Sequence, residues 1–170
     1  MLGRFVLAMV LVVAGGTLQA QEGPDPTRAT THLEPTIAPA NLALLVQPLP
    51  ESALLDEIAA WQGLLQSTVE ELNTTRLQIR KINVIEAAEE AGEEPAPELL
   101  VGPPVDGVDA ERLAEDAGEL LAQRAALLER FEVVVDAYEA KGGDPTSSRT
   151  YARAVSGFEL DWTNPDAAWK

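Results

Sequence analysis

The sequence contains no cysteine among its 170 residues, and only 5% of its residues are aromatic. The absence of cysteine excludes disulfide bonds, thiolate nucleophiles and cysteine-ligated metals. With so few aromatic residues, any hydrophobic core must be built mainly from aliphatic side chains. Basic residues are scarce too: 12 Lys and Arg stand against 28 Asp and Glu, a formal net charge of −16. Such a surface repels phosphate backbones, so we expect no nucleic-acid partner.

Catalytic residue patterns are also missing. The single histidine, His32, has only scattered carboxylates near it in the sequence, without the spacing of a metal site. The acidic run at 86–94 lacks the alternating ligand register of a calcium loop. No nucleophile is paired with a base, and no glycine-rich loop is built to hold phosphate. We therefore expect no catalytic residue, no metal, no cofactor and no small-molecule substrate, and a protein that is not an enzyme.

Residues 1–20 have the organisation of a secretory signal. Arg4 supplies the positive charge, and the apolar run at 5–14 is about ten residues long, half of what a spanning helix needs. Ala20 ends an acceptable cleavage site of bacterial style, although an uncleaved N-terminal anchor is the alternative. These features predict export to the bacterial periplasm. Residues 21–39 are rich in Pro and Thr, which predicts an extended or disordered tail that leaves His32 exposed.

Apolar residues at heptad spacing predict two long helices, at about 51–85 and 109–141. An acidic, proline-rich loop at 86–108 separates them, although the first helix could continue weakly to Ala91, with Gly92 ending it. Their similar lengths and single connection predict an all-α fold, a long antiparallel helical hairpin of coiled-coil type that occupies residues 40–145. A short apolar helix or turn at 40–46 is expected to pack against it. The seam between the long helices is predicted to contain Leu54, Ile58, Trp61, Leu65, Leu72, Ile79, Leu113, Leu120, Leu127, Phe131, Val134 and Tyr138.

Polar residues near this seam have local explanations. Glu57 lies in the early turns of the first long helix, where the helix dipole favours acids. Asp109 is a good N-cap for the second long helix. Arg124 is the odd residue on an otherwise apolar seam. It either pairs with a glutamate across the seam and fixes the register, or extends to the rim.

The last part of the chain, residues 146–170, predicts a short helix followed by an aromatic segment. The runs at 151–161 and 167–169 resemble the segment just before the membrane in bacterial mechanosensitive ion channels of the small-conductance type. Residues 32–36, 54–65 and 140–145 are similar to the same family, so the resemblance covers most of 31–169. The aromatic residues of this pre-membrane segment are Tyr151, Phe158, Trp162 and Trp169.

The resemblance implies a periplasmic helical region that precedes the transmembrane helices of a channel and contributes to assembly or gating. This sequence stops at Lys170, before any spanning helix, so no pore residue can be assigned. We expect either a fragment of a channel protein or a free-standing version of this region. Its expected partners are further copies of itself or a membrane channel at the inner membrane. The alternative is a free-standing periplasmic coiled-coil adaptor.

Overall fold

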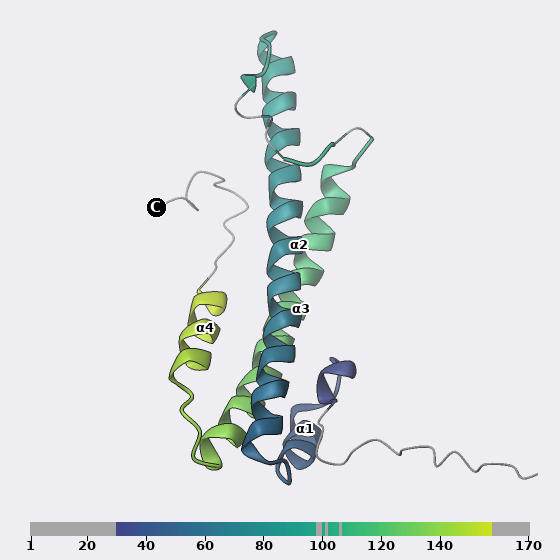
Figure 1. Ribbon diagram of the computed structural model, residues 1–170. Helices are drawn as coiled ribbons and strands as arrows, with labels where there is room; N and C mark the ends of the chain where they lie inside the picture. The colour runs from purple at the N-terminus through teal and green to yellow at the C-terminus, as the bar shows by residue number, and fades with distance from the viewer. Residues whose placement is uncertain (1–29, 98–99, 101, 106, 158–170) are drawn as a thin grey trace, which may run out of the picture.

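The computed structural model describes residues 30–97, 100, 102–105 and 107–157, and every regular element in these ranges is helical. A 3₁₀ turn, η1 (Thr31–Leu33), precedes four α-helices (Figure 1). These are α1 (Pro39–Val46), α2 (Glu51–Ala91), α3 (Ala110–Ala140) and α4 (Thr146–Ser156). The predicted all-α class is confirmed. The predicted signal at 1–20 and the aromatic residues Phe158, Trp162 and Trp169 lie outside the described residues.

Helices α2 and α3 pack closely and run in opposite directions (Figure 1). The first turns of α2 share one apolar cluster with the last turns of α3. At the other end, the segment before α3 returns along α2, where Lys81 Nζ donates a hydrogen bond of 3.3 Å to the carbonyl of Pro103. We call the end where α2 begins and α3 ends the base of the hairpin, and the opposite part the distal half.

Helix α2 follows the longer of the two predicted courses, because the acidic run continues the helix to Ala91 instead of opening the loop. Alanine and glutamate are good helix formers, which favours this extension without apolar periodicity. Gly92 then ends the helix in the left-handed region, with φ of 67°. Its N–H donates to the carbonyl of Glu89, and that of Glu93 donates to Ala88, so two terminal carbonyls are satisfied. The connection therefore begins at residue 92 rather than 86.

Helix α3 begins at Ala110, directly after its N-cap residue Asp109. The Asp109 side chain accepts a hydrogen bond of 2.9 Å from the backbone N–H of Glu111, which satisfies one of the free donors of the first turn. The helix ends at Ala140, and Gly142 follows with φ of 96°, a conformation that glycine adopts without strain.

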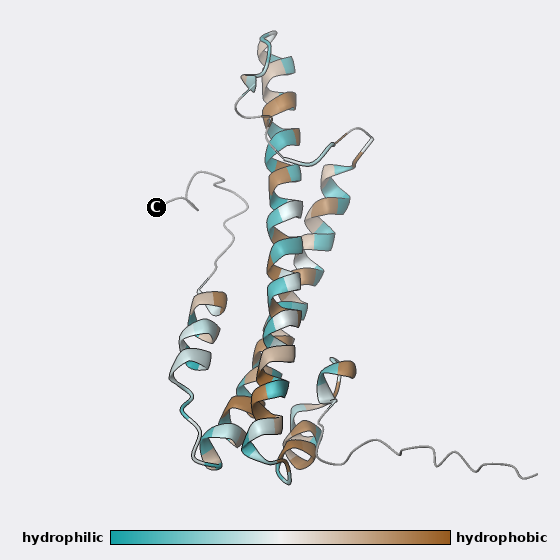
Figure 2. Cartoon of the chain, viewed as in Figure 1, coloured by the Kyte–Doolittle hydropathy of each residue, from teal (hydrophilic) through white to brown (hydrophobic). Residues whose placement is uncertain are grey.

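The main apolar core lies at the base, where α1, α2, α3 and α4 meet. Its centre is made by Trp61, Phe131, Leu54 and Val134, none of which exposes any surface. Among its described residues, the distal half holds a narrow strip of buried side chains. These are Thr68, Leu72, Thr75, Ile82, Leu113 and Ala117. Most of the apolar burial, and with it most of the stability, is therefore at the base. Figure 2 colours the chain by hydropathy, and hydrophobic residues are dense in α1 and in the first turns of α2.

The predicted seam follows this core closely. Its members are buried except Ile79 and Leu120, which are half-buried, and Arg124 is half-buried as well. Within the described ranges, no helix combines the length and apolar character needed to cross a bilayer.

Candidate interaction surface

The N-terminal segment, residues 30–37, packs against the base, which corrects the predicted tail over this range. Residues 21–29 lie outside the described residues. Residues 21–39 were expected to be extended or disordered, with His32 exposed. From residue 30 onward the chain instead forms η1, and Thr31 is buried. The physical reason is a carboxylate in the early turns of α2 that binds η1 as well as suiting the helix dipole.

That carboxylate belongs to Glu57, whose side chain is fully buried at the start of α2. It accepts hydrogen bonds from the backbone N–H of Thr31 at 3.0 Å and from the Thr31 hydroxyl at 2.6 Å. The backbone N–H of His32 adds a third at 3.3 Å. The imidazole Nδ1 of His32 lies 3.4 Å from both carboxylate oxygens. A buried carboxylate needs such partners, and η1 supplies them.

Trp61 completes this cluster, since its indole Nε1–H donates to the Thr31 hydroxyl at 3.2 Å. Sequence reasoning missed the role of Glu57. A signal was available, because Glu57 lies three residues after Leu54 and four before Trp61, on the same apolar stripe of the helix. An acid at such a position requires a partner, although the sequence does not say which segment supplies it.

A second anchor holds the chain between η1 and α1. Arg130 of α3 donates from Nε to the carbonyl of Ile37 at 2.6 Å and from Nη2 to the carbonyl of Thr36 at 3.3 Å. Its Nη1 also donates to the carbonyl of Ala126. The N-terminal segment is therefore tied to both long helices of the hairpin.

Helix α4 is fastened to the other side of the base. The ring of Tyr151 meets that of Phe131 edge to face, with centroids 6.0 Å apart. The Tyr151 hydroxyl donates to the carbonyl of Gln62 in α2 at 3.2 Å. Burial raises the pKa of this phenol. Tyr151, which the sequence placed in the pre-membrane segment, is thus a packing residue that joins α4 to both long helices.

Exposed charges support the attachment of α4. Arg149 Nη2 pairs with Asp136 at 2.9 Å and also with Glu139, both on α3. The hydrogen bond with Glu139 is the main cause that raises the pKa of Arg149. Before the helix, Asp144 accepts from the hydroxyl and backbone N–H of Thr146, which lowers the pKa of Asp144. Solvent screens all these groups, so they orient α4 more than they stabilise it.

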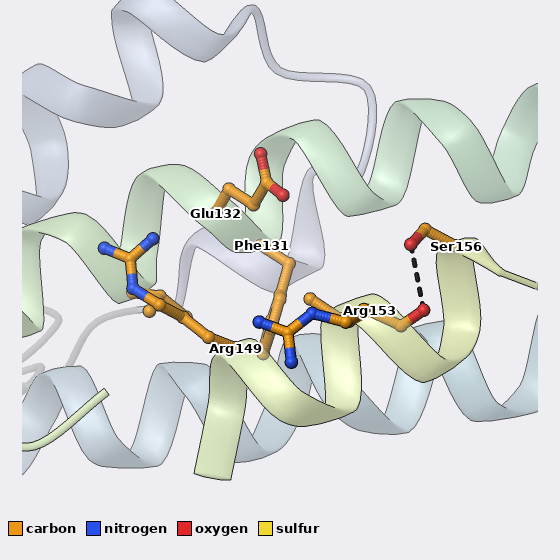
Figure 3. A pocket seen from close by; sticks show the side chains of 7 residues that line it. Phe131, Glu132, Arg149, Arg153 and Ser156 are labelled. Carbon is orange, nitrogen blue, oxygen red and sulfur yellow. Dashed lines mark hydrogen bonds between the residues drawn. The ribbon is translucent and has the colours of Figure 1, made fainter. Parts of the chain in front are cut away.

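Two hollows flank the end of α3. The smaller, about 290 Å³, lies between α3 and α4 over Phe131, Val135 and Ala152 (Figure 3). Its charged lining is mixed, with Glu132 from α3 and Arg149 and Arg153 from α4. The larger, about 550 Å³, is a groove between α1 and α3 lined mainly by small apolar residues.

Large apolar side chains are exposed around the base as well. Leu33 of η1 and Leu44 of α1 each expose 69% of their surface, and Leu45 exposes 52%. Leu55 on the first turns of α2 exposes 45%. Leu44 and Leu45 are neighbours on one short helix, and exposed apolar side chains that gather in this way mark candidate interaction sites. In the described part of the chain, no group of three His, Asp or Glu residues is arranged to hold a metal ion.

The structure thus defines the class of protein as an all-α helical hairpin whose base is widened by short helices on two sides. No protein-family model, curated protein or solved structure matches this chain. The resemblance to mechanosensitive channels therefore stays a prediction that rests on the sequence motifs alone.

Proposed function

We propose that this chain is a non-catalytic, exported helical domain that acts in the assembly or gating of a mechanosensitive-type membrane channel. The helical hairpin supplies a scaffold with interaction surface at its base. The sequence resemblance supplies the channel context. The bacterial periplasm, reached through the signal at 1–20, is the proposed location.

One observation carries the proposal: the attachment of α4 to the hairpin. Tyr151 reaches both long helices at once, through the ring of Phe131 in α3 and the carbonyl of Gln62 in α2. Ala152 and Val155 add buried apolar contact from the same helix. Helix α4 carries the beginning of the segment that resembles the pre-membrane region. A displacement of the chain beyond residue 157 would therefore pull directly on the core at the base.

The uneven core of the hairpin supports the same role. The base is a packed junction of four helices, whereas the distal half is a two-helix strip with a narrow apolar seam. A domain of this kind holds its shape where the accessory helices join it and bends more easily at its far end. A rigid base with a more flexible far end suits a domain that positions other parts of a channel or transmits a displacement to them, rather than one that catalyses a reaction.

The proposal is tested in the bacterium that encodes the chain, by measuring survival after a sudden fall in osmolarity. We expect deletion of the gene to lower survival and the wild-type gene to restore it. Tyr151→Ala removes the contacts with Phe131 and Gln62 and should restore survival less well. Thr150→Ala, at an exposed neighbouring position, is the matched control and should act as wild type. Unchanged survival after deletion would contradict the proposal.

A free-standing periplasmic adaptor is the second candidate, because the exposed leucines around α1 are suited to a protein partner. The two are separated by reading the genomic frame downstream of codon 170 and by purifying the native protein. Transmembrane helices encoded in that frame support the channel proposal. A soluble complex with another periplasmic protein and no channel subunit supports the adaptor.

A further inference from the structure

Helix α1 is apolar on all sides but covered on one side only. Asn41 is the only polar residue in its eight positions. Leu42 and Val46 are buried against the hairpin, with 0% and 1% of their surface exposed. Leu44 and Leu45 point away from that side, with 69% and 52% exposed. A helix that is apolar all round is normally buried all round, so the outer side of α1 calls for a further covering surface.

The groove between α1 and α3 lies beside these leucines. Ala43 and Val46 form the apolar part of its α1 wall, and Val133, Ala137 and Ala140 that of its α3 wall. The lining also includes Gln47, Asp136 and Lys141. Small side chains leave room for larger ones, and the volume is about 550 Å³. Exposed leucines therefore stand next to a hollow whose lining is mainly apolar. An interface with two-fold symmetry needs a self-complementary surface, and a protruding leucine beside a hollow that can receive it meets this condition.

The distribution of charge along the chain favours a second copy of the chain as the partner that covers this surface. No charged residue occurs from residue 36 to residue 50, although the chain as a whole carries −16. The far end of the groove adds one acid and one base, Asp136 and Lys141, whose charges are of opposite sign. Two copies that met through charged faces would repel each other, whereas the uncharged stretch brings few like charges together. Lipid is a poorer occupant, since α1 has no Lys or Arg to hold anionic headgroups and the rest of the chain is strongly acidic.

We propose that a second copy of this chain docks on α1, with Leu44 of each copy seated in the groove between α1 and α3 of the other. This inference deepens the proposed function by naming a partner and the surface that receives it. The interface is small, since it centres on an eight-residue helix. We therefore expect a dissociation constant on the order of 1–100 μM.

Sedimentation velocity of the purified full chain, over a concentration series up to about 500 μM, tests the proposal. Wild type should pass from monomer to dimer within that range. Leu44→Glu places a charge in the interface and should raise the dissociation constant at least about tenfold. Ala122→Glu, at an exposed position on α3, adds the same charge elsewhere and is the matched control. Raising the salt should tighten the wild-type dimer, because it screens the repulsion between two acidic chains.

A wild-type chain that is monomeric throughout would overturn the proposal, and so would a dimer that Leu44→Glu and Leu45→Glu both leave intact. Both leucines are exposed, so circular dichroism should show an unchanged fold in these variants. Flotation of a monomeric chain with phosphatidylcholine vesicles, lost in Leu44→Glu, would assign the surface to lipid instead. None of these readouts depends on osmotic survival, so failure of the dimer and failure of the proposed function are distinguishable.

Discussion

The hydroxyl of Thr31 donates a hydrogen bond of 2.6 Å to the carboxylate of Glu57, across 26 positions of the chain. The same hydroxyl accepts a hydrogen bond from the indole of Trp61. The Thr31 hydroxyl thus both donates and accepts a hydrogen bond, and the backbone N–H of Thr31 also donates to Glu57. This contact fixes the N-terminal segment on the hairpin and turns an expected tail into part of the folded base.

Removal of the carboxylate should therefore destabilise the whole domain. Glu57→Ala leaves the donors of Thr31 unsatisfied in a buried site, and we expect a loss of about 2–3 kcal/mol in the free energy of unfolding. Glu57→Gln keeps the shape and one acceptor oxygen, so its loss should be smaller. Urea denaturation followed by tryptophan fluorescence measures both. Asp56→Ala, on the exposed side of the same turn, is the control, and equal stability of Glu57→Ala and Asp56→Ala would refute the role of the contact.

Two glycine-to-alanine substitutions should have opposite effects on the free energy of unfolding. At Gly143 an added Cβ would lie within about 2.4 Å of the Tyr138 ring, a buried side chain with little room to move. We expect Gly143→Ala to cost about 1–3 kcal/mol. Gly63, inside α2, has open space around the same position. Gly63→Ala should stabilise by about 0.5–1 kcal/mol, because alanine is the better helix former.

Thermal and urea denaturation of these two variants against wild type give the comparison. Gly118, exposed inside α3 and also with open space, serves as a second helical position where alanine should stabilise. A neutral effect of Gly143→Ala would mean that the Tyr138 ring rearranges at no cost.

Backbone amides should exchange unevenly with solvent along α2. Residues 54–65 of α2 belong to the packed base, whereas residues 83–91 of the same helix contain no buried side chain. We expect the amides of 83–91 to exchange at least about tenfold faster, since local opening there exposes little apolar surface. Hydrogen exchange read by mass spectrometry or NMR measures the difference. Uniform protection along α2 would show that the distal end is held by contacts of its own.

The phenol of Tyr151 should make stability fall at alkaline pH. Burial raises the pKa of Tyr151 above that of a free tyrosine, which is about 10. Its contribution is complete below pH ~10 and is lost as pH rises through the higher pKa of the folded state, because the unfolded chain releases its proton first. Tyr151→Phe has no phenol to ionise, so its stability lacks this dependence on pH. At pH 8 the variant should be less stable by about 0.5–1.5 kcal/mol, the value of the lost hydrogen bond to Gln62.

Urea unfolding between pH 8 and pH 11 measures this effect, since groups other than Tyr151 titrate equally in both proteins. The stability difference between wild type and Tyr151→Phe should narrow above pH 10. A difference that stays constant over the range would mean that the Tyr151 phenol does not lose this stabilising effect at alkaline pH.

Much of the architecture could be predicted because it depends on local patterns. The heptad spacing of Leu54, Ile58 and Leu65 identified the face of α2 that is buried, and Leu127 with Val134 did so for α3. Asp109 marked the start of α3 through capping chemistry. The end of α2 has no such mark, since alanine and glutamate beyond residue 85 extend a helix without any apolar signal.

The candidate surface depended on pairs that lie far apart in the sequence. Glu57 binds Thr31, Arg130 binds the carbonyl of Ile37, and Tyr151 binds the carbonyl of Gln62. Backbone carbonyls and amides carry no sequence signature, so the composition of residues 30–37 does not predict these hydrogen bonds. The groove between α1 and α3 is likewise a property of two helices brought together.

The sequence by itself determined the helical class, the buried faces and the cap of α3, because these follow from periodicity and short-range hydrogen bonding. Only the tertiary structure decided that η1 closes over Glu57, that α4 is anchored through Tyr151, and that the outer leucines of α1 stand beside an apolar groove. Each of these outcomes requires a specific partner across the fold, and long-range contacts of that kind depend on how the helices pack, not on the residues adjacent in the chain.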